Sequence, residues 1–177
     1  MKVIFALVAI LALVASASAK TSYRSTPADI VSFIVGVADG LEISMNENAT
    51  QCVTESGATF DEFVTAFHLI DQGFQKKSVA LVGQGIEDFG LALQEVPVAF
   101  QTCGVEKFVQ EIESLAKQLS SGTDGIIEII LKEALNIFHN RVDLSGEFKA
   151  AIADWKSGSF FGCGQNVGEI VGILLTA

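Results

Sequence analysis

The chain has 177 residues, of which half are hydrophobic, and its 21 acidic residues outnumber its 11 basic residues to give a formal net charge of −10 at pH 7. A surface that binds nucleic acid needs clustered lysine and arginine. The densest basic spot here is the pair Lys76-Lys77, so nucleic acid is excluded as a partner and an anionic membrane surface is disfavoured.

The start of the chain predicts a secretory signal peptide at residues 1–19. Met1-Lys2 supplies a positive end, and residues 3–15 form an uninterrupted apolar run that is shorter than the roughly 20 residues needed to span a bilayer. The small residues 16–19 then predict cleavage before Lys20. We expect residues 20–177 to form a single helical domain, secreted or in the secretory-pathway lumen, with no integral membrane span. The alternative is an uncleaved anchor or a buried first helix.

Apolar residues at helical spacing predict four helices in the first two-thirds of the mature chain. The first begins with Thr26 as N-cap and Pro27 in the first turn. The second begins at Thr59, which has the spacing of a capping box with Glu62. The third runs from about 78 to 96 and is limited by Pro97, and the fourth covers 105–119. Residues 46–56 are expected to form a polar stretch between two helices.

Three further helices are predicted after residue 122. The fifth begins at 123–124 and ends near 138; its isoleucine pairs are β-branched, but a polar edge at helical spacing favours a helix over a strand. Asp143 or Ser145 caps a sixth that ends at Gly158, and residues 159–175 form the last. Because no run alternates with period 2, we predict an all-α fold, a compact antiparallel bundle or array of about six or seven helices.

The three cysteines are an odd number for a chain that enters an oxidising compartment, which predicts one disulfide and one remaining thiol. Connectivity is not deducible from sequence alone. We favour Cys52 with Cys103, because both lie at polar helix junctions. Cys163 lies between two glycines in an apolar helix and fits a buried thiol. The alternative, a catalytic thiol at Cys163, would need a nearby cationic group to lower its pKa.

Asn48-Ala49-Thr50 matches the acceptor pattern for N-glycosylation and falls in the polar stretch 46–56. We therefore expect a glycan on Asn48. The alternative is an ordinary asparagine-rich loop.

Glycines recur every four residues in two predicted helices, at Gly36 and Gly40 and again at Gly164, Gly168 and Gly172. Each interior glycine costs about 1 kcal/mol relative to alanine, so a close approach of another backbone should offset it. We expect a helix-packing face at these five positions, with a self-association or ligand-facing surface as the alternative.

The 13 phenylalanines are accompanied by one tyrosine and one tryptophan, and most lie on inward-facing stripes. A filled core is expected. The alternative is an interior that holds a lipid or another apolar small molecule. His68 and His139 have no cysteine or histidine partner at metal-ligand spacing, and adjacent acidic pairs diverge around a helix. The sequence therefore predicts no catalytic residue, no metal site and no cofactor.

Three C-terminal segments carry a family resemblance. They are 138–144 (Phe-His-Asn-Arg-Val-Asp-Leu), 150–155 (Ala-Ala-Ile-Ala-Asp-Trp) and 158–168 (Gly-Ser-Phe-Phe-Gly-Cys-Gly-Gln-Asn-Val-Gly). They resemble a group of small secreted helical proteins of ciliated protists, and the segments around Cys52 and Cys103 show a weaker similarity to the same group. The resemblance implies class and compartment and carries over no catalytic residue. We predict a non-enzymatic secreted protein that acts as a protein-interaction or structural module, with self-association as one form; the alternative is a carrier of an apolar ligand.

Overall fold

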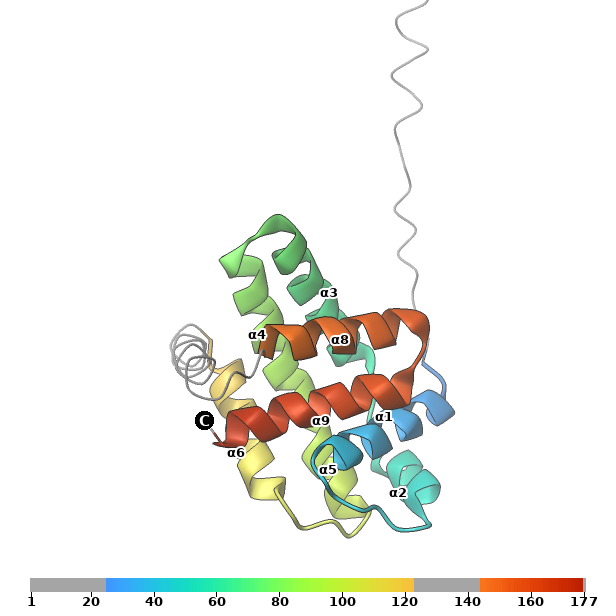
Figure 1. Cartoon of the computed structure of the whole chain (residues 1–177). Helices are drawn as coiled ribbons and strands as arrows, with labels where there is room; N and C mark the ends of the chain where they lie inside the picture. Colours follow the sequence, from blue (N-terminus) through green and yellow to red (C-terminus); the bar gives the residue numbers. More distant parts are fainter. Residues whose placement is uncertain (1–24, 123–143, 177) are drawn as a thin grey trace, which may run out of the picture.

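The computed structural model describes residues 25–122 and 144–176, and every helix or strand in these two ranges is an α-helix. The predicted signal peptide, the predicted fifth helix and His139 lie outside the described residues. The described helices, drawn in Figure 1, are α1 (Pro27–Gly40), α2 (Ala49–Ser56), α3 (Asp61–Lys76), α4 (Val79–Leu93), α5 (Glu95–Thr102), α6 (Val109–Ser120), α8 (Leu144–Ser157) and α9 (Phe160–Thr176). The all-α prediction is confirmed.

Local sequence explains several of the helix ends. Thr26 caps α1 in a capping box, because its hydroxyl accepts the backbone N–H of Asp29 at 3.3 Å while the Asp29 carboxylate accepts the N–H of Thr26 at 2.8 Å. Gly158 follows α8 with a φ of 79°, a left-handed conformation that glycine adopts without strain. The second predicted capping box is not formed: the Thr59 hydroxyl donates to the Glu62 side chain instead.

Tertiary contacts correct three of the predicted boundaries. The polar stretch 46–56 contains the helix α2, which buries Cys52 and Val53 against the core. The predicted helix 78–96 is two helices, because Pro97 lies in the first turn of α5, where its missing N–H needs no partner, whereas an uninterrupted helix would bring its ring against the Leu93 carbonyl. Finally, α6 begins at Val109 rather than 105, since Phe108 has a left-handed φ of 64°.

The helices pack as two hairpins joined by α1. Helices α3 and α4 are antiparallel neighbours, and so are α8 and α9 (Figure 1). Helix α1 packs most extensively on α9, and the two run in the same direction, because Phe33 faces Gly164 and Val37 faces Gly168. The first and last described helices therefore lie side by side.

A cluster of phenylalanine rings fills the centre of the core. Phe33, Phe60, Phe63, Phe67 and Phe89 are all at most 1% exposed. Ring centroids lie 4.7 Å apart for Phe33 and Phe60 and 5.7 Å apart for Phe63 and Phe89, within the range of favourable aromatic pairs. These rings come from α1, the α2–α3 connection, α3 and α4. Because Phe148 of α8 also contacts Phe89, the cluster joins both hairpins.

Replacing a ring at the centre of this cluster should destabilise the whole fold. We expect Phe63→Ala to lower the free energy of unfolding by about 3–5 kcal/mol, because it removes buried area and leaves a cavity. The matched control is Phe161→Ala, whose ring is 43% exposed and whose loss should cost less than about 1 kcal/mol. Urea unfolding followed by circular dichroism measures both values, and equal losses would contradict the core described here.

Candidate functional site

Four of the five predicted glycines form a direct backbone contact between α1 and α9. A methyl group built on Gly36 would overlap the carbonyl oxygen of Phe161, and one on Gly164 would overlap that of Phe33. Gly40 and Gly168 meet the Gln165 and Val37 carbonyl oxygens in the same way. In each case a Cα–H points at a carbonyl of the other helix, an arrangement typical of weak Cα–H···O hydrogen bonds.

The fifth position, Gly172, lies at the end of this face and has more room. Its nearest neighbour is the Cδ2 atom of Leu41, 3.8 Å from where a Cβ would stand. The other four glycines each contact the backbone of the partner helix, the arrangement expected of a helix-packing face.

Three more glycines make close contacts that the sequence analysis did not single out. Gly73 packs on Val82 and Gly85 on Ile70, both between α3 and α4, while Gly90 of α4 packs on Leu119 of α6. Their irregular spacing hides them from a search for a four-residue repeat. The available signal was the helix-propensity penalty that each one carries within an apolar helix.

Alanine at Gly164 should destabilise the protein even though alanine favours helices. We expect a loss of about 1–3 kcal/mol or more in the free energy of unfolding, because the added methyl group separates two backbones. Gly172→Ala is the matched control in the same helix and should be neutral or stabilising by up to about 1 kcal/mol. Thermal unfolding compares the two variants; a stable Gly164→Ala protein would show that α1 and α9 are not in backbone contact.

The predicted disulfide between Cys52 and Cys103 is confirmed. It joins α2 to the end of α5, with a Cα–Cα distance of 5.0 Å and a sequence separation of 51 residues. The side-chain amide of Asn46 donates to the Cys103 carbonyl oxygen at 3.2 Å and ties the preceding loop to the same point. In the chain-entropy model a loop of this size contributes roughly 4 kcal/mol to stability.

Asn48, the predicted glycosylation site, lies beside this disulfide at the first residue before α2. Its side chain is exposed and makes no capping hydrogen bond, while its backbone N–H donates to the Asn46 side chain at 3.0 Å. Asn48 and both cysteines line the same small polar pocket of about 240 Å³.

Cys163 is the free thiol, and it is fully buried in α9. Burial raises the pKa of this thiol, and the nearby carboxylate of Asp154 raises it further. The thiol is therefore protonated at neutral pH, which is unfavourable for a nucleophile. His68 is exposed and pairs with Gln72 one turn along α3. Within residues 25–122 and 144–176, no group of three or more His, Cys, Asp or Glu side chains could hold a metal ion.

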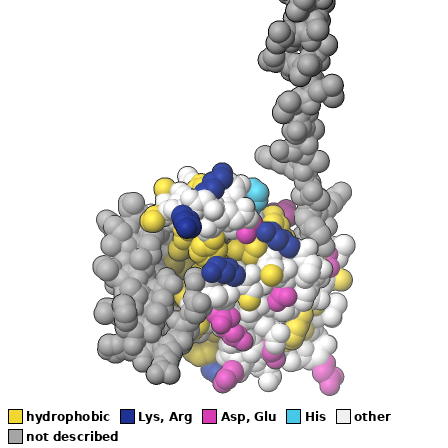
Figure 2. All heavy atoms as spheres, turned by 45° about the horizontal axis from the view of Figure 1, so that its top comes forward, with side chains coloured by type: hydrophobic (Ala, Val, Ile, Leu, Met, Phe, Trp, Pro, Cys, Tyr) yellow, Lys and Arg dark blue, Asp and Glu magenta, His cyan; other side chains and the backbone are white. Residues whose placement is uncertain are grey.

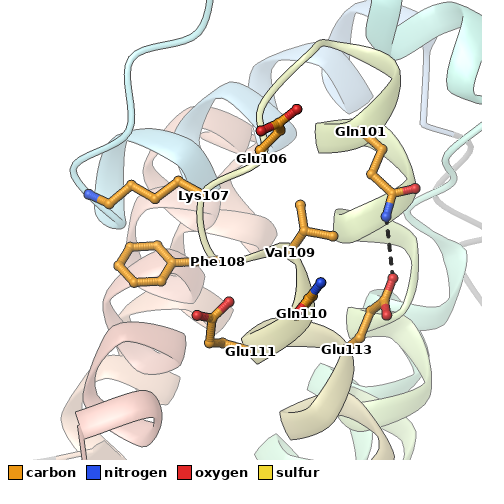
Figure 3. A pocket seen from close by; sticks show the side chains of 8 residues that line it. All are labelled: Gln101, Glu106, Lys107, Phe108, Val109, Gln110, Glu111 and Glu113. Carbon is orange, nitrogen blue, oxygen red and sulfur yellow. Dashed lines mark hydrogen bonds between the residues drawn. The ribbon is translucent and has the colours of Figure 1, made fainter.

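A surface pocket of about 610 Å³ lies where the chain passes from α5 into α6 (Figure 3). It is open and acidic, unlike the phenylalanine-lined interior considered from the sequence. Gln101 donates to Glu113 across it at 3.4 Å, and the Lys107 ammonium lies 4.7 Å from the centroid of the Phe108 ring. The lining residues are Gln101, Glu106, Lys107, Phe108, Val109, Gln110, Glu111 and Glu113.

Lysines gather on the opposite part of the molecule, where the end of α3 meets α8. The Lys149 ammonium lies 5.4 Å from the Phe74 ring centroid, and Lys156 pairs with Asp71 at 2.7 Å. Lys76 and Lys77 end α3 beside Phe74. These four residues, called the lysine face below, are four of the six Lys and Arg residues in the described ranges. Figure 2 shows basic side chains around an apolar area on this side of the molecule.

Across the part of the chain that the structure describes, no helix combines the length and apolarity needed to cross a membrane.

Comparison with known proteins shows what kind of chain this is. The family model described as "SctB-like: Secreted protein B-like" matches residues 14–176. Three Dictyostelium discoideum proteins are similar: Secreted protein A (50% identical, covering 87% of this chain and 88% of that protein), Secreted protein B (43%, covering 83% and 79%) and Secreted protein C (45%, covering 83% and 30%). The chain thus spans less than a third of Secreted protein C. No solved structure matches.

These matches correct the resemblance drawn from the C-terminal segments. The three relatives come from Dictyostelium discoideum, so the family is not specific to ciliates, and the similarity covers most of the chain rather than its last third. The predicted localisation is confirmed, because all three relatives are named as secreted proteins. The chain belongs to the SctB-like family of secreted proteins.

Proposed function

We propose that the protein is a non-catalytic secreted module that acts through contacts with other proteins, and that the lysine face is its contact surface for an acidic protein. One observation carries this proposal: a chain of net charge −10 places four of its six described basic residues on one face. Lysines scattered over the surface would keep the protein soluble equally well. The clustering of four lysines on one face therefore suggests a partner of opposite charge.

The same face offers apolar area for a contact. Val79, at the tip between α3 and α4, is 77% exposed, and Phe74 is only half-buried beneath Lys149. Protein interfaces combine an apolar centre with a polar or charged rim. Asp71 neutralises Lys156, whereas Lys76 and Lys77 are exposed at the end of α3 and can meet a carboxylate on a partner.

The buried reactive group supports a role without catalysis. Cys163 has no exposed surface and a raised pKa, so it lacks both the access and the thiolate that a nucleophile needs. The acidic pocket at α5 and α6 is open to solvent, whereas active sites usually enclose most of the ligand that they bind.

Reversing the charge of the lysine face should abolish binding. We expect sedimentation velocity of labelled protein in cell-free medium from its source cells to show a complex that Lys76→Glu with Lys77→Glu eliminates. High salt should also dissociate the complex, because the Debye length falls to about 3 Å at 1 M ionic strength and charge attraction is screened. The matched control is Lys107→Glu with Lys117→Glu, which makes the same change in net charge on another surface and should leave the complex intact.

Two results would contradict this proposal: a wild-type protein that sediments only as a monomer, or an equal loss of the complex in both double variants. The same measurement on purified protein alone distinguishes a second copy of the chain from a different acidic partner.

The alternative role as a carrier of an apolar ligand is opposed by the ring packing. The buried phenylalanines contact one another, so they occupy the space that a ligand would need. We expect native mass spectrometry of protein from its source to show no co-purifying lipid. A stoichiometric lipid that survives gel filtration would show instead that the interior opens.

A further inference from the structure

We infer that Asn48 carries an N-linked glycan, and that this glycan is attached before α2 folds and before the Cys52–Cys103 disulfide closes. Secretion brings the chain into the compartment where such glycans are added. The acceptor pattern is Asn48-Ala49-Thr50. For this pattern to be used, the folded protein must have room for the sugar, and the transferase must meet the site in a conformation that it recognises.

The folded protein accommodates a glycan on Asn48 without losing a hydrogen bond that holds α2. The Asn48 backbone is held on both sides: its N–H donates to the Asn46 side chain at 3.0 Å, and its carbonyl accepts the Cys52 N–H at 3.0 Å. The Asn48 side chain is exposed and caps nothing. A sugar on its Nδ2 atom therefore projects into solvent.

The folded protein does not, however, present the acceptor pattern for recognition. The pattern requires both the asparagine and the threonine two residues later, so the transferase must reach the two side chains together. In an extended chain, residues i and i+2 lie on one face, whereas around a helix they do not. Thr50 lies in the first turn of α2, so helix formation separates the two groups.

Asn48 precedes Cys103 in the sequence by enough residues for the transferase to act before the disulfide forms. Cys103 follows Cys52 by 51 residues, so Asn48 enters the lumen well before the disulfide can form. Until then α2 has only 8 residues, and an isolated helix shorter than about 12 residues is marginal in water. The segment is therefore extended for part of the time that it is accessible.

The transfer itself balances with one co-reactant, an oligosaccharide linked to a lipid pyrophosphate. The Asn48 Nδ2 atom attacks the anomeric carbon of the first sugar and forms the new carbon–nitrogen bond. The bond from that carbon to the pyrophosphate oxygen breaks, and the lipid pyrophosphate leaves with the electron pair. The amide loses one proton, which the departing pyrophosphate or water takes up, and no oxidation or reduction takes place.

The glycan would be far from the lysine face. Figure 1 places α2 at the opposite end of the molecule from the tip between α3 and α4. It would instead cover the polar pocket that joins Asn48 to the disulfide, which is lined in part by Gln51 and Thr102. The glycan and the proposed contact surface can therefore be tested independently.

The site is tested by expressing the full chain in secreting eukaryotic cells and measuring the intact mass of the secreted protein before and after peptide N-glycosidase. We expect a glycan mass that the glycosidase removes from wild type and from Thr50→Ser. Asn48→Gln and Thr50→Ala should both lack it completely. A wild-type mass equal to that of the bare polypeptide would overturn the proposal.

The order of events is tested with protein made without glycan in the bacterial periplasm and then incubated with purified transferase and lipid-linked oligosaccharide. We expect the oxidised, folded protein to be modified at least about tenfold more slowly than the reduced, unfolded protein, because only molecules with α2 locally open are substrates. Equal rates would refute the order. In cells, Cys103→Ser should carry at least as much glycan as wild type, and a lower occupancy would count against the order as well.

Discussion

The contact between the backbones of α1 and α9 is the constraint on which the remaining structure depends. At Gly36 and Gly164 each helix presents a Cα–H to a carbonyl of the other, so no side chain can be inserted without moving a helix. The two helices run in the same direction, which aligns their macrodipoles unfavourably. Close packing and weak Cα–H···O contacts offset that repulsion. Because the other described helices all lie between α1 and α9 in the sequence, this contact forms only after those helices have been made.

The other helices are arranged around this pair through the phenylalanine cluster. Phe33 projects from α1 into the rings of Phe60 and Phe63, which connects the α1–α9 pair to the α3–α4 hairpin. Phe148 of α8 meets Phe89 of α4 at 5.2 Å and closes the cluster from the other side. The disulfide holds α2 and α5 at the edge of the core. These ring contacts and the disulfide join helices that are far apart in the sequence, so the loss of one ring from the cluster destabilises several helices together.

The residues that hold the fold together are distinct from those that remain on the surface. The closely packed glycines and the phenylalanine cluster lie in the interior, and the thiol of Cys163 is buried with them. The surface retains an acidic side around α5 and α6 and the lysine face at α3 and α8. In the proposed role these separated charges orient the partner, because complementary charge steers encounter and sets register.

The sequence by itself determined the helical class, secretion and the capping of α1 by Thr26, and it favoured the disulfide pairing that the structure confirms. These follow from local patterns, such as apolar spacing and N-cap chemistry, or from short-range composition. It located the glycine face but not its partner, because spacing marks a bare helix surface without saying which backbone covers it. Tertiary structure alone decided that α1 and α9 pack in parallel and that Gly172 stays outside their close contact. It also decided that residues 46–56 contain a helix, since burial of Cys52 and Val53 outweighs the polar composition of that stretch. The lysine face escaped the sequence analysis for the same reason: Lys149 and Lys156 are more than 70 residues from Lys76 and Lys77 in sequence, and only the packing of α8 against α3 brings their charges together.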